Sequence, residues 1–429
     1  MRELRARWAV LAAGIDAGTP AERDRSVDAL RAVAILGVVF GHWLVTALTT
    51  ADGGLSTTSP LAHMPRLAPL SWVFQTLAVF FLVGGHVAAK GYVSARAHGS
   101  SYRTWVGQRL GRLFRPVAAV LVLWALVAAG MLIGGVELGT VRTLLRLVLS
   151  PLWFLLVFAA LTAATPLVAR LSPVWPSAVV AGVDVWRFGF GGPEWVGWVN
   201  VGAGWLVPYT LGAAWASGSL AGRRTPALLL GGGTVATAAL VLWGGYPASM
   251  VGVPGAAVSN LNPPTLAAVS FGLAQCGLAL LVREPLARAM RRPAAWAKVA
   301  LVNLSAMTVF LWHQTAMMAV TSLGLLVSAD LPGLHTVPGS PGWIAVRLLW
   351  LPVFAAALTL CWAAFRSYEQ GARLRRGSDR TVPASGPPAS GPFRPSRPAG
   401  PSRAGRGVGA ARGHRAPRAH SPGKGVAHV

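Results

Sequence analysis

Long apolar runs alternate with short polar loops along most of this chain. A helix needs about 20 apolar residues to cross the roughly 30 Å hydrocarbon core of a bilayer. Runs near that length predict an all-α integral membrane protein, in which about ten transmembrane helices form a bundle. The ten predicted spans cover approximately 28–48, 71–92, 114–134, 150–169, 176–187, 198–216, 226–243, 263–282, 299–321 and 343–365.

The basic residues of the loops predict how the bundle is oriented. The two most basic loops carry Lys90, Arg96, Arg103, Arg109, Arg112, Arg283, Arg288, Arg291, Arg292 and Lys298. The alternate loops are poor in Lys and Arg; the first has only Arg66 and the seventh and ninth have none. Because cytoplasmic loops are enriched in Lys and Arg, this pattern predicts a multi-pass plasma-membrane protein whose N- and C-termini are both cytoplasmic.

The predicted organisation has three parts. Residues 1–27 form a cytoplasmic leader, residues 28–366 form the membrane domain, and residues 367–429 form a disordered, basic, Pro/Gly/Arg-rich cytoplasmic tail. Only 12% of the residues are charged, against about 25% in a soluble domain. The net charge of +25 is carried by loops and tail, so it indicates a lipid bilayer as partner and no nucleic acid.

Cofactor motifs are missing from the sequence. It contains no P-loop, HExxH or CxxC, and no GxGxxG that follows a strand. Cys276 and Cys361 lie inside apolar runs, which predicts small packed side chains with no disulfide and no metal site. No permanently bound cofactor is expected, so any chemistry must come from polar residues in or beside the helices.

One such residue, His42, lies deep in the first predicted span. It follows Arg31 by eleven residues, or roughly 16 Å and three turns plus about 20° of helix, so the two side chains share a face. An ionisable group at that depth is costly and is therefore a candidate functional residue. The alternative, a neutral histidine hydrogen-bonded between packed helices, carries about equal weight on spacing alone.

A set of short segments resembles the acyltransferase 3 family of membrane proteins. In chain order these are Arg25-x-x-Asp28-x-x-Arg31 with His42, Phe80-Phe81-Leu82-Val83-Gly84-Gly85, Arg109-Leu110-Gly111-Arg112, Leu152-Trp153-Phe154-Leu155 and Phe310-Leu311-Trp312-His313. Val183-Asp184-x-x-Arg187 and Asn262-Pro263-Pro264-Thr265 are similar to features of one subgroup. The chain departs from the family pattern at His86, where an aromatic residue is usual, and at Phe310, where Tyr is usual.

The resemblance implies an O-acyltransferase that moves an acyl group, such as acetyl, from acyl-CoA to a hydroxyl. The acceptor would be a glycan, a lipid-linked sugar or a natural product. Acyl-CoA would be a co-substrate, and a histidine inside the bundle would be the general base. A non-enzymatic transporter or permease for a small polar solute is the alternative, because buried His and Asp also suit proton relays. A family member that has lost its activity is a third possibility.

Three residues are predicted at the reacting centre. His42 is the first candidate for the base, and His313 lies at a similar depth, about fourteen residues past the start of the ninth predicted span. We therefore predict that both imidazoles face one central cavity, within about 10 Å of each other. Asp28 pairs with Arg31 across one helical turn and is first an orienting residue and only second a catalytic one.

The predicted donor and acceptor sites lie at opposite ends of the bundle. Arg31, Arg109, Arg112 and Arg115 are predicted to bind the phosphates of acyl-CoA at the cytoplasmic end, to which the central cavity should open. The alternative is that these arginines only set the topology. The outer helix ends carry Trp153, Asp184, Arg187 and Asn262, which are weaker candidates for the acceptor site and equally suited to be interface anchors or helix caps.

Overall fold

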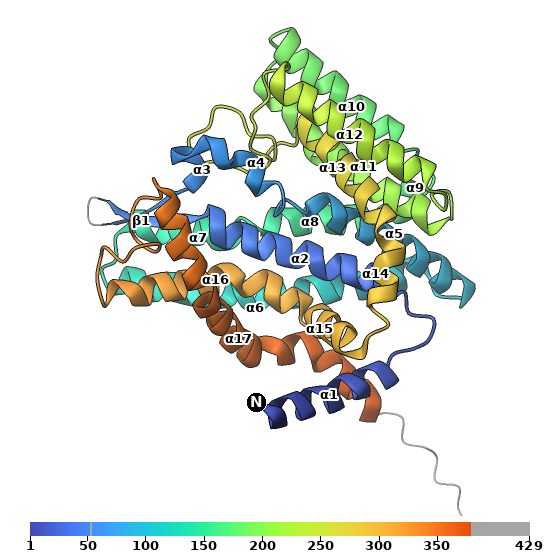
Figure 1. Cartoon of the computed structure of the whole chain (residues 1–429), viewed down its shortest axis with the longest axis horizontal. Helices are drawn as coiled ribbons and strands as arrows, with labels where there is room; N and C mark the ends of the chain where they lie inside the picture. The colour runs from blue at the N-terminus through green and yellow to red at the C-terminus, as the bar shows by residue number, and fades with distance from the viewer. Residues whose placement is uncertain (52–53, 379–429) are drawn as a thin grey trace, which may run out of the picture. The chain divides into compact units, whose positions relative to one another are not determined.

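The computed structural model describes residues 1–51 and 54–378, and these are mostly helical (Figure 1). The longer helices are α1 (Arg2–Ala17), α2 (Arg25–Val45), α5 (Leu77–Ala97), α6 (Tyr102–Ile133), α7 (Leu138–Leu149), α8 (Leu152–Ala163), α10 (Val174–Asp184), α11 (Val199–Ala216), α12 (Arg224–Leu242), α13 (Leu266–Leu281), α15 (Pro293–Leu304), α16 (Ala306–Leu325) and α17 (Pro341–Ser378). The shorter ones are α3 (Pro60–His63), α4 (Ala68–Ser71), α9 (Thr165–Val168) and α14 (Arg283–Ala289). Residues 379–429, most of the predicted tail, lie outside the described residues.

Six helical segments of the described chain are long and apolar enough to cross a membrane, or up to eight if each strongly bent pair is one span. The multi-pass character expected from the apolar runs is thus supported, whereas the count of ten spans and the orientation of the termini remain predictions. The shortest predicted span, 176–187, corresponds to α10, which has 11 residues. At about 1.5 Å per residue α10 is roughly 16 Å long, too short to cross a bilayer alone.

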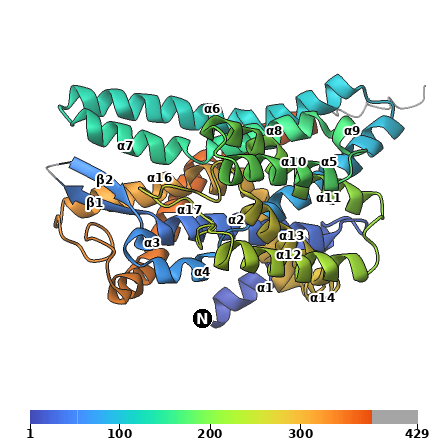
Figure 2. The ribbon, with the colours of Figure 1, turned by 90° about the horizontal axis from the view of Figure 1, so that it is seen from above.

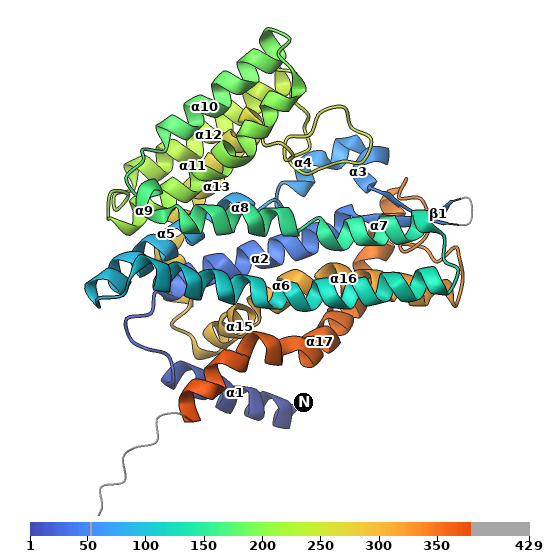
Figure 3. The ribbon, with the colours of Figure 1, turned by 180° about the vertical axis from the view of Figure 1, so that it is seen from behind.

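Helix α2, which carries Arg31 and His42, lies in the interior of the helical bundle. Its N-cap is Asp24, whose carboxylate accepts hydrogen bonds from the backbone N–H groups of Ser26 and Val27, as is typical at a helix start. It packs against α5, α14, α15 and α16, and Figure 1 shows it running beside α16; Figure 3 shows the bundle from behind. With a neighbour on most sides, α2 can hold polar side chains away from lipid.

Helices α5 and α11 make the closest contact in the bundle. A Cβ added at Gly85 of α5 would overlap the Tyr209 carbonyl, and one added at Gly212 of α11 would overlap the Leu82 carbonyl. Small residues let helix backbones approach in this way. The second glycine of the Phe80–Gly85 segment therefore has a packing role, joining α2 and α5 to the group formed by α10, α11, α12 and α13.

The all-α prediction missed a β-hairpin directly after α2. Strands β1 (Ala47–Ala51) and β2 (Gly54–Thr58) pair antiparallel, and β2 packs against α7, where Thr140 Oγ1 accepts a hydrogen bond from the Leu55 backbone. Figure 2 shows the hairpin beside α7 at the end of the bundle. The segment has four Thr residues, a residue type that is enriched in strands, but its shortness made it indistinguishable from a loop.

The ninth predicted span is broken. Helices α15 and α16 meet at Ser305 with a bend of 72°, and both contact α2. Helix α16 brings His313 to the level of His42, although the start of the span lies in a differently directed helix.

A buried arginine joins the end of α2 to α17. Arg347 is 1% exposed, and its guanidinium donates to the carbonyl oxygens of Trp43 at 2.7 Å, Thr46 at 2.8 Å and Gly333 at 2.8 Å. Its charge also lies 4.7 Å from the ring centroid of Phe354, a cation–π contact. The sequence analysis did not single out this residue, although a charged side chain inside the predicted span 343–365 was a signal for it.

We expect Arg347→Met to destabilise the protein, because three buried carbonyl groups lose their donor at about 1–3 kcal/mol each. The thermal unfolding midpoint of the detergent-solubilised variant should fall by several degrees. Arg142→Met removes an exposed arginine of α7 and should leave the midpoint unchanged. Equal midpoints for the two variants would contradict the role assigned to Arg347.

Candidate functional site

The centre of the candidate site is a hydrogen-bonded pair of histidines from α2 and α16. His42 Nδ1 lies 2.7 Å from His313 Nε2, and the rings stack with centroids 4.9 Å apart. The prediction that His42 and His313 lie within about 10 Å of each other is confirmed. Trp43 Nε1 also donates to the His313 carbonyl at 3.0 Å, which fixes the register between the two helices.

The hydrogen bonds assign a tautomer to each neutral ring. His313 Nδ1 lies 2.6 Å from the Phe310 carbonyl oxygen, and a carbonyl can only accept, so this nitrogen carries the proton. His313 Nε2 is then an acceptor, and His42 Nδ1 must donate to it. The proton of His42 is therefore on Nδ1, which leaves the Nε2 lone pair free to take up another proton.

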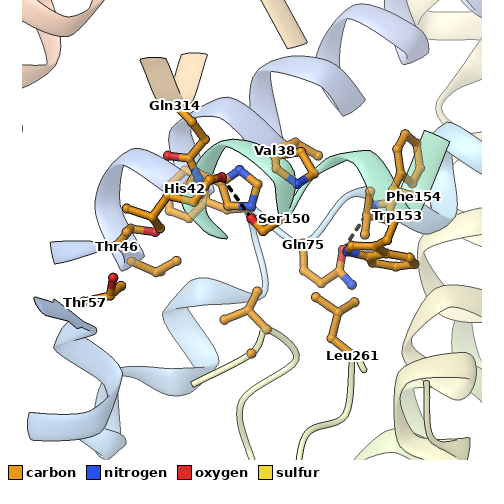
Figure 4. Close-up of a pocket in the computed structure, with 18 of the residues that line it drawn as sticks. Val38, His42, Thr46, Thr57, Gln75, Ser150, Trp153, Phe154, Leu261 and Gln314 are labelled. Atoms are coloured by element: carbon orange, nitrogen blue, oxygen red, sulfur yellow. Dashed lines mark hydrogen bonds between the residues drawn. The ribbon is translucent and has the colours of Figure 1, made fainter. Parts of the chain in front are cut away.

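A cavity of about 300 Å³ opens beside His42. We call it the histidine cavity; its polar lining residues are His42, Thr46, Thr57, Thr58, Gln75, Ser150 and Gln314. Figure 4 shows His42, Thr46 and Gln314 along one side and Trp153 and Phe154 on the other. Among the residues that the structure describes, the lining contains no Lys, Arg, Asp or Glu, and His42 is its one ionisable side chain.

The prediction that both imidazoles face the cavity is wrong for His313. His313 is fully buried and is not among the lining residues, because its two nitrogens are directed at His42 and the Phe310 carbonyl. The geometry gives the two rings different possible tasks. His42 can touch a substrate, whereas His313 can only position His42.

A second cavity, of about 280 Å³, is lined by Arg31, Arg109 and Asn303 together with apolar side chains. We call it the arginine cavity. Arg109 donates to the Val87 carbonyl at 3.3 Å, and Arg31 pairs with Asp28 at 3.5 Å. Two cationic side chains over apolar walls suit a ligand with an anionic end and an apolar end.

Aromatic side chains separate the two cavities. Phe154 and Phe310 line both of them, and their ring centroids lie 5.4 Å apart. The sequence analysis predicted one cavity that opens from the histidines to the arginines. The structure instead has two cavities that meet at these rings, because Phe154 of α8 and Phe310 of α16 pack against each other there.

The remaining predicted donor residues lie farther out. Arg112 lines a neighbouring cavity of about 280 Å³ together with Arg109, and it is exposed. Arg115 is exposed and lines none of these three cavities. The geometry thus brings Arg31 and Arg109 together, with Arg112 next to them, and leaves Arg115 apart.

Asp28 is not brought to the histidine pair. It precedes His42 by fourteen residues of the same helix, or about 21 Å of rise. Its carboxylate lies between two arginines, with Arg23 Nε at 2.6 Å and Arg31 Nη1 at 3.5 Å. This geometry favours the orienting role for Asp28 over the catalytic one.

Of the four acceptor candidates, only Trp153 lines the histidine cavity. Asp184 is buried, and its carboxylate accepts hydrogen bonds from Asn200 at 2.9 Å, Tyr246 at 3.0 Å and the Leu266 backbone at 2.7 Å. It therefore joins α10, α11 and α13 to the loop after α12, as a structural residue does.

Arg187 and Asn262 also lie outside the histidine cavity. The Arg187 guanidinium packs 4.9 Å from the ring centroid of Phe188. Asn262 is exposed in the loop before α13, although its neighbour Leu261 reaches the cavity. The loop contributes to the cavity through apolar side chains rather than through the polar residues that the sequence singled out.

Sequence reasoning missed Gln75 and Gln314, which both line the histidine cavity. A signal was present for Gln314, because it directly follows His313 and is a polar residue inside an apolar run. The described residues contain no group of three or more His, Cys, Asp or Glu side chains that could hold a metal ion.

Comparison with known proteins bears on which chemistry this site performs. No curated protein and no solved structure matches the chain significantly. A family model described as an acyltransferase domain matches residues 24–366, which include both cavities and the histidine pair. The match covers most of the chain. It favours the predicted acyltransferase over the alternative, a transporter or permease. The chain therefore belongs to the acyltransferase 3 family and is a multi-pass membrane O-acyltransferase, which moves an acyl group from a donor to a hydroxyl acceptor.

Proposed function

We propose that this enzyme transfers a short acyl group such as acetyl from acyl-CoA to a hydroxyl of a carbohydrate or natural product, with His42 as general base, at the plasma membrane. The observation that carries the proposal is the pairing of His42 with His313. This hydrogen bond leaves His42 Nε2 unprotonated on a ring that lines an otherwise uncharged cavity.

In the proposed reaction the acceptor hydroxyl lies in the histidine cavity, next to His42. His42 Nε2 removes the hydroxyl proton as the oxygen attacks the thioester carbonyl carbon, forming a C–O bond. The C–S bond then breaks, and the CoA sulfur leaves with the proton returned by the imidazolium. The products are an ester and free CoA-SH, so atoms and charges balance without a further reactant.

His313 is a positioning residue in this scheme. Its Nε2 accepts from His42 Nδ1, which holds the ring of His42 in one orientation and one tautomer. When His42 takes the hydroxyl proton, the same hydrogen bond becomes charge-assisted and stronger. His313 is itself fixed by the Phe310 carbonyl, so the orientation of the base is determined by the backbone of α16.

Acyl-CoA would enter from the cytoplasmic end, with its phosphates near Arg31, Arg109 and Arg112. The apolar walls of the arginine cavity suit the arm that carries the acyl group. Phe154 and Phe310 then lie between the arm and the acceptor. Arg115 is left out of this proposal, because it lines none of the three cavities, whereas Arg112 lines the third together with Arg109.

We expect His42→Ala to abolish transfer while the protein still accumulates in the membrane. Loss of a general base costs about 10²- to 10⁴-fold in rate. The test incubates membranes with [¹⁴C]acetyl-CoA and an extract of the native cells, and counts label in products other than acetyl-CoA and acetate. His98→Ala changes an exposed histidine at the end of α5 and is the matched control. Activity of His42→Ala within about threefold of the control would exclude His42 as the base.

The role of His313 is tested by a double-mutant cycle. His313→Ala should lower kcat by at least about tenfold with little change in either KM, because His313 acts only through His42. The double variant should be no slower than His42→Ala alone, since residues that act as a unit are not additive. Independent, multiplicative losses would show that His313 has a separate task.

Replacing both Arg109 and Arg112 by Gln should raise the KM for acyl-CoA about tenfold or more and leave kcat nearly unchanged. Phosphate contacts are made equally in the ground and transition states, so they affect binding rather than the chemical step. Raised salt should weaken donor binding more in the wild type than in the variant. Arg103→Gln, at an exposed position of the same helix, is the control. A low kcat with an unchanged donor KM would move these arginines out of the donor site.

A further inference from the structure

The start of α5 forms part of the wall of the histidine cavity, because Gln75 and Leu77 both line it. The N-terminus of a helix carries a partial positive charge. In α5 the first turn has no acidic residue to balance this charge, and the N-cap residue Thr76 makes no side-chain capping bond, since its hydroxyl donates to the Ala34 carbonyl at 2.7 Å. One part of the wall is therefore partly positive, although no Lys or Arg of the described chain lines the cavity.

Gln75 adds an unpaired hydrogen-bond donor at the same place. The residue is 6% exposed, and its Oε1 accepts from the Leu77 backbone N–H at 3.1 Å. Because an N–H can only donate, this bond fixes which end of the amide is the oxygen. The side-chain nitrogen, Nε2, has no hydrogen-bond partner in the described part of the chain and is not enclosed by protein atoms. The NH₂ group of Gln75 is therefore open to the histidine cavity.

The segment before α5 is held in place by its neighbours. Thr76 is bonded to α2 through the Ala34 carbonyl, and α2 also carries His42. The backbone carbonyl of Gln75 accepts a hydrogen bond from the Gln275 side-chain amide of α13. The backbone and the amide orientation of Gln75 are thus both fixed, so its NH₂ is preorganised with respect to the helix that carries the base.

The position of Gln75 suits a group that contacts the thioester. Figure 4 shows Gln75 beside Trp153 and Phe154, with His42 on the other side of the cavity. Phe154 also lines the arginine cavity, from which the thioester would arrive. A carbonyl group that reaches the histidine cavity past Phe154 would lie between the NH₂ of Gln75 and the acceptor hydroxyl next to His42.

We infer that Gln75 is a catalytic residue, whose NH₂ donates a hydrogen bond to the thioester oxygen as that oxygen becomes an oxyanion. The inference rests on the proposed function, because it assigns a further group to the same reaction. When the acceptor oxygen bonds to the carbonyl carbon, the π electron pair of the C=O bond moves onto its oxygen. Gln75 and the start of α5 stabilise this charge without transferring a proton. The C=O bond re-forms when the C–S bond breaks.

The first test compares Gln75→Met with Gln75→Glu. Gln75→Met removes both the donor and the bond to Leu77, whereas Gln75→Glu keeps an oxygen for the Leu77 N–H and replaces only the donor. Loss of one oxyanion donor costs about 10²- to 10³-fold in rate. Both variants should therefore lower kcat by at least about 100-fold and change the KM for acyl-CoA less than about threefold. Across pH 7–9 the loss in Gln75→Glu should be largest at pH 9, since an ionised carboxylate cannot donate.

The same two variants distinguish catalysis from a structural role. If Gln75 only supported the start of α5, Gln75→Glu would keep the bond to Leu77 and the wild-type kcat, while Gln75→Met would lower the unfolding midpoint. That result would overturn the inference. Gln108→Met, at an exposed position of α6, is the matched control and should keep both the wild-type kcat and the wild-type midpoint.

The second test replaces the reacting oxygen. In the dithioester analogue of acetyl-CoA a sulfur atom stands in place of the carbonyl oxygen, and sulfur is a weak hydrogen-bond acceptor. The ratio of the wild-type rate to the Gln75→Met rate should therefore be at least about fivefold smaller with the analogue than with acetyl-CoA. An equal ratio for the two donors would show that Gln75 does not contact this atom.

The outcomes separate this inference from the proposed function. Rates are measured as label transferred from [¹⁴C]acetyl-CoA to an extract of the native cells. If the wild type transfers label and His42→Ala does not, the proposed function stands, and a wild-type kcat in both Gln75 variants would overturn the inference alone. If the wild type forms no labelled product, or if His42→Ala is as active as the wild type, the proposed function fails and the inference fails with it.

Discussion

The hydrogen bond between His42 Nδ1 and His313 Nε2 sets the positions of most other parts of the site. Each imidazole alone would be a costly polar group among apolar helices, whereas together they satisfy one another. The bond also has a direction. Because the Phe310 carbonyl can only accept, the protons are ordered along the pair, and the one free lone pair is on the ring that lines the cavity. A structural contact between α2 and α16 thus leaves His42 ready to act as a base.

The sequence predicted this pair because a regular helix has a fixed rise per residue. The number of residues from the start of a span therefore gives the depth of a side chain in the membrane. Counting residues from the ends of two spans placed His42 and His313 at one level, and the cost of a polar group inside the membrane favoured a shared environment. The bend at Ser305 did not affect this prediction, since Phe310 and His313 both lie within α16. Residue spacing also placed Arg31 and Arg109 at one end of the bundle, and both line the arginine cavity.

The sequence did not predict which residues reach the histidine cavity where their positions depend on the path of a loop. Asp184 and Asn262 lie near helix ends, as an acceptor site would require, but Asp184 is taken up by hydrogen bonds that connect three helices and a loop. The hairpin after α2 contributes Thr57 and Thr58 to the histidine cavity. Its position depends on packing against α7, which no local pattern in the residues 47–58 encodes.

One departure from the family pattern, Phe310, lies at the boundary between the two cavities. Phe310 replaces the usual Tyr, so the boundary that it forms with Phe154 contains no hydroxyl that could hydrogen-bond and hold it closed. In the proposed reaction the acyl group must pass between these rings. The Phe310 carbonyl accepts a hydrogen bond from His313, whereas its ring packs against the rings of Phe154 and His313. In the proposed reaction, rotation of this ring would open a path between the cavities without moving the backbone that orients the histidine pair. Movement of α16 itself would break the His42–His313 hydrogen bond at the moment when it is needed. For this reason, side-chain motion is the route consistent with the proposed chemistry.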